Sequence, residues 1–172
     1  MMSEVITKIS EQLLQVDFAF SQKPIVIGGM AMEYYGIRRS GADIDLVICD
    51  YDYQKLSQLY PEKSKDIYGD LGVIIEPLEI WRSIALLDYD FYKSEAIEYE
   101  KVIIVSLDKL LLMRVCAMEI DKYMQDLNLM KEYYYNNFRN KDFLHEAEQH
   151  IPSYNKFDGV IVGGKYEDKT TV

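Results

Sequence analysis

The feature that most constrains this fold is a segment spanning residues 24–50, which reads PIVIGGMAMEYYGIRRSGADIDLVICD. Residues 25–27 form a short β-branched run that is typical of a buried strand. The glycine pair at 28–29 allows the backbone to turn sharply and to approach a ligand closely. Residues 30–35 have the length of a short helix, and residues 43–48 have the pattern of a second strand. The expected local order is therefore strand, glycine turn, helix, loop and strand.

The second strand carries two aspartates. Side chains two positions apart in a strand share a face, so Asp43 and Asp45 are expected to point the same way while Ile44 and Leu46 point into the core. Two carboxylates about 4 Å apart repel each other by about 4 kcal/mol at an effective dielectric constant near 20. A divalent cation relieves this repulsion, and magnesium commonly binds one or two carboxylates together with substrate phosphates. The pattern therefore predicts a nucleoside triphosphate site.

The glycine pair, the thirteen residues that follow it and the sequence Asp43-Ile44-Asp45-Leu46 resemble the signature of the nucleotidyltransferase superfamily related to DNA polymerase beta. Within it, the chain is similar to small bacterial nucleotidyltransferases, a group with antibiotic-modifying enzymes and AbiEii-type toxins. The residues that carry this similarity are Gly28-Gly29-Met30-Ala31, Gly36, Arg39-Ser40 and Asp43-Ile44-Asp45. The resemblance implies an α+β fold, in which a mixed β-sheet is flanked by helices and followed by C-terminal helices.

The resemblance also implies how the nucleotide is held. Gly28 and Gly29 would approach the triphosphate, with ATP as the expected donor, and the expected phosphate contacts are Arg39, Ser40 and Arg114. Arg114 stands where the family has a lysine. Because arginine is planar and bidentate, this exchange keeps the charge but changes the contact geometry.

By the same resemblance, Asp43 and Asp45 bind two Mg²⁺ ions, and a third carboxylate on a later strand completes the metal site and takes the proton from the attacking hydroxyl. We assign that role to Glu76, at the end of the next apolar strand, although the family more often has aspartate there. Asp70 and Glu79 flank the same strand and remain alternatives.

The rest of the chain predicts further helices and strands. Helices are expected at 3–16, 51–60, 106–117, 119–137 and 142–150, and strands at 71–77, 95–100 and 102–105, with a turn-rich connection at 61–70. Residues 78–90 fit either a short helix or a loop that lines the acceptor pocket.

We expect one compact unit, comprising a catalytic core (1–105), a helical region packed on it (106–152) and a polar tail (153–172). The near P-loop at 159–166 is rejected because it has tyrosine in place of the serine or threonine that binds magnesium.

The amino-acid composition limits the classes of acceptor and the cellular compartment that we expect. The net charge of −10 and the absence of a basic patch favour a cationic or neutral small molecule, or a protein, over nucleic acid as the acceptor. No apolar run approaches the ~20 residues of a membrane span. Cys49 and Cys116 form no Cys-x-x-Cys pair and lie in apolar segments, as expected for a reduced cytoplasmic protein.

The expected function is transfer of a nucleoside monophosphate from a nucleoside triphosphate to an acceptor hydroxyl by a two-metal mechanism. Two alternatives stay open. One is a catalytically silent binding or regulatory protein, suggested by the departures at Glu76 and Arg114. The other is a toxin that modifies transfer RNA. The resemblance is also compatible with a homodimer, because a second subunit often completes the acceptor pocket in small members of the family.

Overall fold

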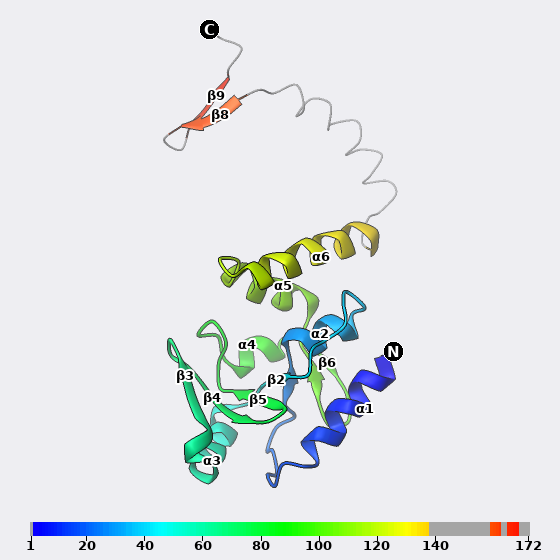
Figure 1. Ribbon diagram of the computed structural model, residues 1–172, viewed down its shortest axis with the longest axis vertical. Helices are drawn as coiled ribbons and strands as arrows, with labels where there is room; N and C mark the ends of the chain where they lie inside the picture. The colour runs from blue at the N-terminus through cyan, green and yellow to red at the C-terminus, as the bar shows by residue number, and fades with distance from the viewer. Residues whose placement is uncertain (1, 138–158, 163–164, 169–172) are drawn as a thin grey trace. The chain divides into compact units, whose positions relative to one another are not determined.

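The computed structural model describes residues 2–137, 159–162 and 165–168 (Figure 1). The chain divides into two compact units, residues 1–131 and 132–172. The helix that begins after residue 106 packs on the sheet, because Leu110 and Met113 belong to the same buried cluster as the strand residues. The helix expected at 142–150 lies outside the described residues.

The first unit contains a seven-stranded sheet in the order β3-β4-β5-β2-β1-β7-β6. The pairs β1–β7 and β2–β5 are parallel and the other neighbouring strands are antiparallel, so the sheet is mixed, as expected. The strands are β1 Ile25–Val26, β2 Ile44–Val47, β3 Ser64–Ile67, β4 Asp70–Ile75, β5 Leu78–Trp81, β6 Ile97–Glu98 and β7 Ile103–Ile104.

Helices flank this sheet, which confirms the α+β class. They are α1 Met2–Leu13, α2 Gly28–Tyr34, α3 Asp50–Leu59, the 3-10 turn η1 Pro61–Lys63, α4 Tyr89–Lys93, α5 Leu107–Cys116 and α6 Asp121–Asn137. α2 contacts β2, α3 contacts β4 and α4 contacts β1, while α1 contacts α2 (Figure 1). None of the described helices is long and apolar enough to cross a membrane.

The core is centred on the middle strands. Ile25 and Val26 of β1 and Ile44 and Leu46 of β2 are fully buried, which confirms the inward direction predicted for the isoleucine and leucine between the aspartates. Burying one such side chain contributes about 1.5–3 kcal/mol. These residues therefore fix the face of β2 that points inward, and with it the face that the aspartates occupy.

Two segments differ from the sequence-based expectation. Residues 64–67 of the expected connection form β3, which pairs with β4 through a turn where Tyr68 and Gly69 have positive φ. All four β3 residues are exposed and three of them are polar, so no alternation of apolar residues marks this strand in the sequence. The strand depends on its pairing with β4. Residues 78–90 were expected to form a short helix or a loop, whereas the structure has strand β5 at Leu78–Trp81 and the start of helix α4 at Tyr89. The strands expected at 95–100 and 102–105 are confirmed as β6 and β7, which form an antiparallel pair.

In the second unit, β8 Gly159–Val162 and β9 Lys165–Asp168 form an antiparallel pair. Residues 159–162 and 165–166 of the near P-loop thus lie on two paired strands.

Candidate functional site

Three carboxylates line one hollow of about 360 Å³. β2 and β5 run parallel, with Asp45 directly opposite Glu79 in the register. Asp43, just before β2, lines the same hollow, as expected from its spacing to Asp45. The alternating pattern of β2 and the pairing with β5 thus bring Asp43, Asp45 and Glu79 to one site.

The structure does not bring Glu76, the residue expected as the third carboxylate, to this hollow. Glu76 is exposed, follows β4 and is not among the residues that line the hollow. β4 is one strand further from β2 than β5, and the chain turns at Pro77 before β5 begins. The carboxylate brought to the aspartates is therefore Glu79, one of the two alternatives.

The other alternative, Asp70, has a structural role. Its carboxylate accepts hydrogen bonds from the Ser83 hydroxyl at 2.7 Å and from the backbone N–H groups of Ala85 and Leu86 at 2.7 and 2.9 Å. Asp70 therefore holds the loop that follows β5 in place.

Asp45 is under electrostatic stress. Burial, followed by the negative charge of Glu79, raises the pKa of Asp45 to about 6, whereas the positive charges of Arg114 and Lys122 act in the opposite direction. A carboxylate that is costly to ionise in this way is one that a bound cation would stabilise.

Gly28 allows Asp45 to occupy this position. Its φ is +61°, and a Cβ atom there would lie 2.1 Å from Oδ2 of Asp45. The backbone is tied at the same point, because the N–H of Ile27 donates to the Asp45 carbonyl at 3.0 Å. The first glycine of the pair is therefore required both by its conformation and by the closeness of the carboxylate.

Gly28→Ala is expected to destabilise the fold and to displace Asp45. The left-handed conformation alone costs a non-glycine residue about 1–2 kcal/mol, and the clash with Oδ2 adds to it. Urea unfolding measures the first effect and magnesium affinity the second. Gly36→Ala is the matched control, because Gly36 also has a positive φ but nothing lies within 4 Å of its Cβ position. Equal losses in the two variants would show that the contact with Asp45 is unimportant.

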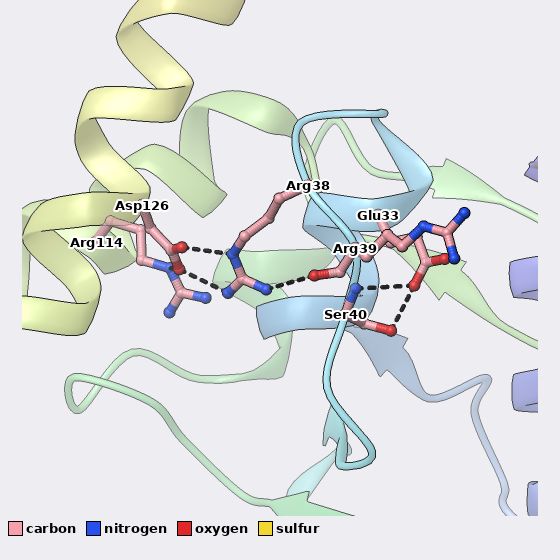
Figure 2. Close-up of polar contacts among 6 residues, drawn as sticks. All are labelled: Glu33, Arg38, Arg39, Ser40, Arg114 and Asp126. Atoms are coloured by element: carbon pink, nitrogen blue, oxygen red, sulfur yellow. Dashed lines mark hydrogen bonds and ion pairs between the residues drawn. The ribbon is translucent and has the colours of Figure 1, made fainter.

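Arg38 and Arg114 also line the hollow. Figure 2 shows that both arginines lie beside the buried Asp126. Arg38 donates from Nε to Oδ1 of Asp126 at 2.6 Å and from Nη2 to Oδ2 at 2.9 Å. Nε of Arg114 lies 3.0 Å from Oδ2, an ion pair without the alignment of a hydrogen bond. Asp126 is only 2% exposed, so this carboxylate, on α6, fixes both guanidinium groups at the hollow.

The environment affects the two arginines differently. The hydrogen bonds to Asp126 raise the pKa of Arg38. Burial lowers the pKa of Arg114, although the charge of Asp126 opposes this effect. The guanidinium of Arg114 lies 4.6 Å from the centre of the Tyr123 ring. Its remaining nitrogens point away from Asp126 in Figure 2, which leaves them oriented for another anion.

The other two expected phosphate contacts do not reach the hollow. Arg39 is exposed and does not line it, and Figure 2 shows its side chain on the side of Glu33, away from Asp126. Ser40 donates to the Glu33 carboxylate from its backbone N–H at 2.9 Å and from its hydroxyl. Ser40 thus closes the loop onto α2, and these two hydrogen bonds lower the pKa of Glu33.

The hollow contains residues that the sequence analysis missed. Arg38, Lys122 and Tyr123 line it together with Gly29 and Arg114, which were expected there. The only sequence signal for Arg38 was its position next to Arg39, and the choice between neighbouring arginines depends on contact with a helix 88 residues later.

The residues present suit magnesium. Asp43, Asp45 and Glu79 offer only carboxylate oxygens, which Mg²⁺ prefers, and the stress on Asp45 shows where positive charge is needed. Within the described part of the chain, no three acidic, histidine or cysteine side chains are already arranged around a metal position. Magnesium in proteins commonly has one or two carboxylates and completes its shell with water and phosphates.

The site thus combines an acidic wall, a cationic wall and a glycine turn in one hollow. Comparison of the sequence with protein-family models and with curated proteins finds no match. Its function is therefore argued from the geometry.

Proposed function

We propose that this protein is a nucleotidyltransferase that moves a nucleoside monophosphate from a nucleoside triphosphate, with ATP as the expected donor, to a hydroxyl group of an acceptor. One observation carries the proposal. One hollow is lined by carboxylates on β2 and β5, by Gly29 of the glycine turn, and by two arginines that Asp126 holds. This arrangement suits a triphosphate accompanied by a divalent cation.

The cationic wall would bind the phosphates. Arg38 and Arg114 are preoriented by Asp126, and Lys122 adds a third positive charge at the hollow. Guanidinium groups suit phosphate because they donate several hydrogen bonds in a fixed plane. Gly29 also lines the hollow and, without a side chain, lets a phosphate come close to the backbone.

The acidic wall would carry the chemistry. Asp43, Asp45 and Glu79 would hold magnesium, which when bound supplies neutralisation of phosphate charge and a lower pKa for the acceptor hydroxyl. The hydroxyl oxygen forms a bond to the α-phosphorus, the bond from that phosphorus to the bridging oxygen breaks, and pyrophosphate leaves with the electron pair. Glu79 accepts the hydroxyl proton.

Calorimetric titration with a non-hydrolysable ATP analogue, with and without magnesium, tests the proposal. Binding is expected to require magnesium and to weaken at least about tenfold in Arg38→Ala, because a charged hydrogen bond contributes about 1.5–3 kcal/mol. Arg39→Ala removes the same charge from the neighbouring, exposed position and should bind nearly as well as the wild type. Absence of magnesium-dependent binding would favour a protein that keeps the fold without the chemistry.

Replacing Glu79 and Glu76 by glutamine, one at a time, distinguishes the roles of the two residues. Glu79→Gln is expected to slow pyrophosphate release from ATP about 10²–10⁴-fold, the usual contribution of a general base. Glu76→Gln should leave the rate unchanged, because Glu76 is exposed and outside the hollow. Pyrophosphate is measured with a coupled assay, with water as the default acceptor. A larger loss in Glu76→Gln than in Glu79→Gln would reverse the assignment.

A further inference from the structure

A second, larger hollow of about 770 Å³ adjoins the same carboxylates. Asp45, Glu79 and Tyr123 line both hollows. A group bound in the second hollow would therefore also reach Asp45 and Glu79, and neither Arg38 nor Arg114 lines this hollow. Its volume is within the range of pockets that hold small organic molecules.

The walls of the second hollow are mainly apolar. They come from β5, the loop after it, the turn between β3 and β4, and the end of α5. The apolar side chains that the argument uses are Trp81, Ile84, Leu86, Met113 and Ile120. Leu86 and Ile120 are 69% and 54% exposed, so this surface is open to solvent and available to a ligand.

The loop that carries Ile84 and Leu86 is held in an unusual conformation. Ala85 and Leu86 have φ of +52° and +60°, in the left-handed region that such residues rarely adopt. The hydrogen bonds from both backbone N–H groups to Asp70 hold this conformation. The apolar wall is thus fixed by the structure and does not depend on a ligand to form.

The charged residues that line the second hollow restrict the charge of a ligand that can bind there. Asp45, Glu79 and Glu119 line the hollow in addition to Asp70, whose carboxylate is already hydrogen bonded to the loop. The only cationic side chain among the described lining residues is Lys65, which lies 5.7 Å from the Trp81 ring centre. An anion placed there would meet an excess of negative charge.

We propose that the second hollow binds the acceptor, and that the acceptor is a neutral or cationic alcohol or phenol with an apolar body. The inference rests on the proposed function. The apolar body lies against Trp81, Ile84 and Met113, and the hydroxyl points to Asp45 and Glu79. Glu79 receives the proton as the oxygen bonds to the α-phosphorus and pyrophosphate leaves.

Two matched fluorescent probes test the pocket on the full-length protein. N-phenyl-1-naphthylamine is neutral, and 8-anilinonaphthalene-1-sulfonate has the same aromatic body with an added negative charge. The neutral probe is expected to bind at least about tenfold more tightly at low salt, because repulsion between charges near a protein surface is of this size. Glu119→Lys should narrow this preference, whereas Glu11→Lys, the same charge change on α1 outside the hollow, should not.

Chemical modification of Cys116 provides a second, independent test of the hollow. It is exposed and lines the hollow, whereas Cys49 is buried, so N-benzylmaleimide should modify Cys116 selectively and block the neutral probe. Cys116→Ser, treated in the same way, should keep binding it. Magnesium-dependent binding of the ATP analogue should survive the modification.

The outcomes separate the two proposals. Loss of the neutral probe, with nucleotide binding retained, on modification of Cys116 supports the acceptor pocket. Equal affinity for both probes, or binding that the modification does not change, overturns the inference and leaves the proposed function standing if the ATP analogue still binds. Failure of the analogue to bind removes the proposed function and the acceptor role together.

Discussion

Asp45→Asn is expected to abolish nucleotide transfer and to make the protein more stable at neutral pH. Asparagine keeps the shape of the side chain but removes the negative charge that would bind magnesium. Loss of several kcal/mol of charge stabilisation corresponds to at least about a thousandfold in rate. Pyrophosphate release measures this effect, and retained turnover would exclude the two-metal mechanism.

The gain in stability follows from the raised pKa of Asp45. Burial and the charges of Glu79 and Asp43 raise it from 3.8 to about 6, against the opposing charges of Arg114 and Lys122. Because the folded state then binds the proton more tightly than the unfolded chain, stability is lost as the pH rises from about 4 through 6. At pH 7 the ionisation of Asp45 thus lowers the free energy of unfolding of the wild type by on the order of 3 kcal/mol. Asparagine does not ionise, so the variant does not lose this stability.

Urea unfolding at pH 8 and at pH 4, without magnesium, checks this sign. Asp45→Asn should be the more stable protein at pH 8, and the difference should disappear near pH 4, where wild-type Asp45 is protonated in the folded state. Magnesium with the ATP analogue should stabilise the wild type more than the variant. A variant that is less stable at pH 8 would contradict the proposed electrostatic stress on Asp45.

Asp126→Ala is expected to cause the largest loss of stability, about 3–5 kcal/mol, because removing one partner of a buried ion pair leaves uncompensated charge. Arg114, 6% exposed, would remain buried beside Arg38 without their shared carboxylate. Affinity for the ATP analogue should also fall, since neither guanidinium would keep its orientation. Chemical unfolding and calorimetry measure the two effects.

Asp50→Ala is the matched control for Asp126. The Asp50 carboxylate lies 2.7 Å from Nε of Arg82, but both side chains are substantially exposed. A surface ion pair of this kind contributes about 0–1 kcal/mol. If both variants lost the same small amount, Asp126 would not be the residue that organises the cationic wall. Asp126→Asn, which keeps hydrogen-bond acceptance at one oxygen, should be intermediate.

Local patterns were sufficient for part of the fold. The β-branched run and alternating residues of 25–27 and 43–48 predicted β1 and β2, because burial of one strand face is recorded directly in the spacing. β3 was missed, because three of its four residues are polar, all four are exposed, and only the partner strand makes them extended. β5 was expected to be part of a short helix or a loop, because its four residues follow directly after the turn at Pro77 and are too few to show a strand pattern.

The sequence by itself determined one half of the candidate site. The period of a strand puts Asp43 and Asp45 on one face, and the glycine pair before them permits a close approach whatever the rest of the chain does. Tertiary structure alone decided the other half. Glu79, and not Glu76, lies beside the two aspartates because β5, and not β4, pairs with β2. Arg38 replaced Arg39 because a buried carboxylate on a distant helix selects between neighbouring side chains, and only folding brings Asp126 to them.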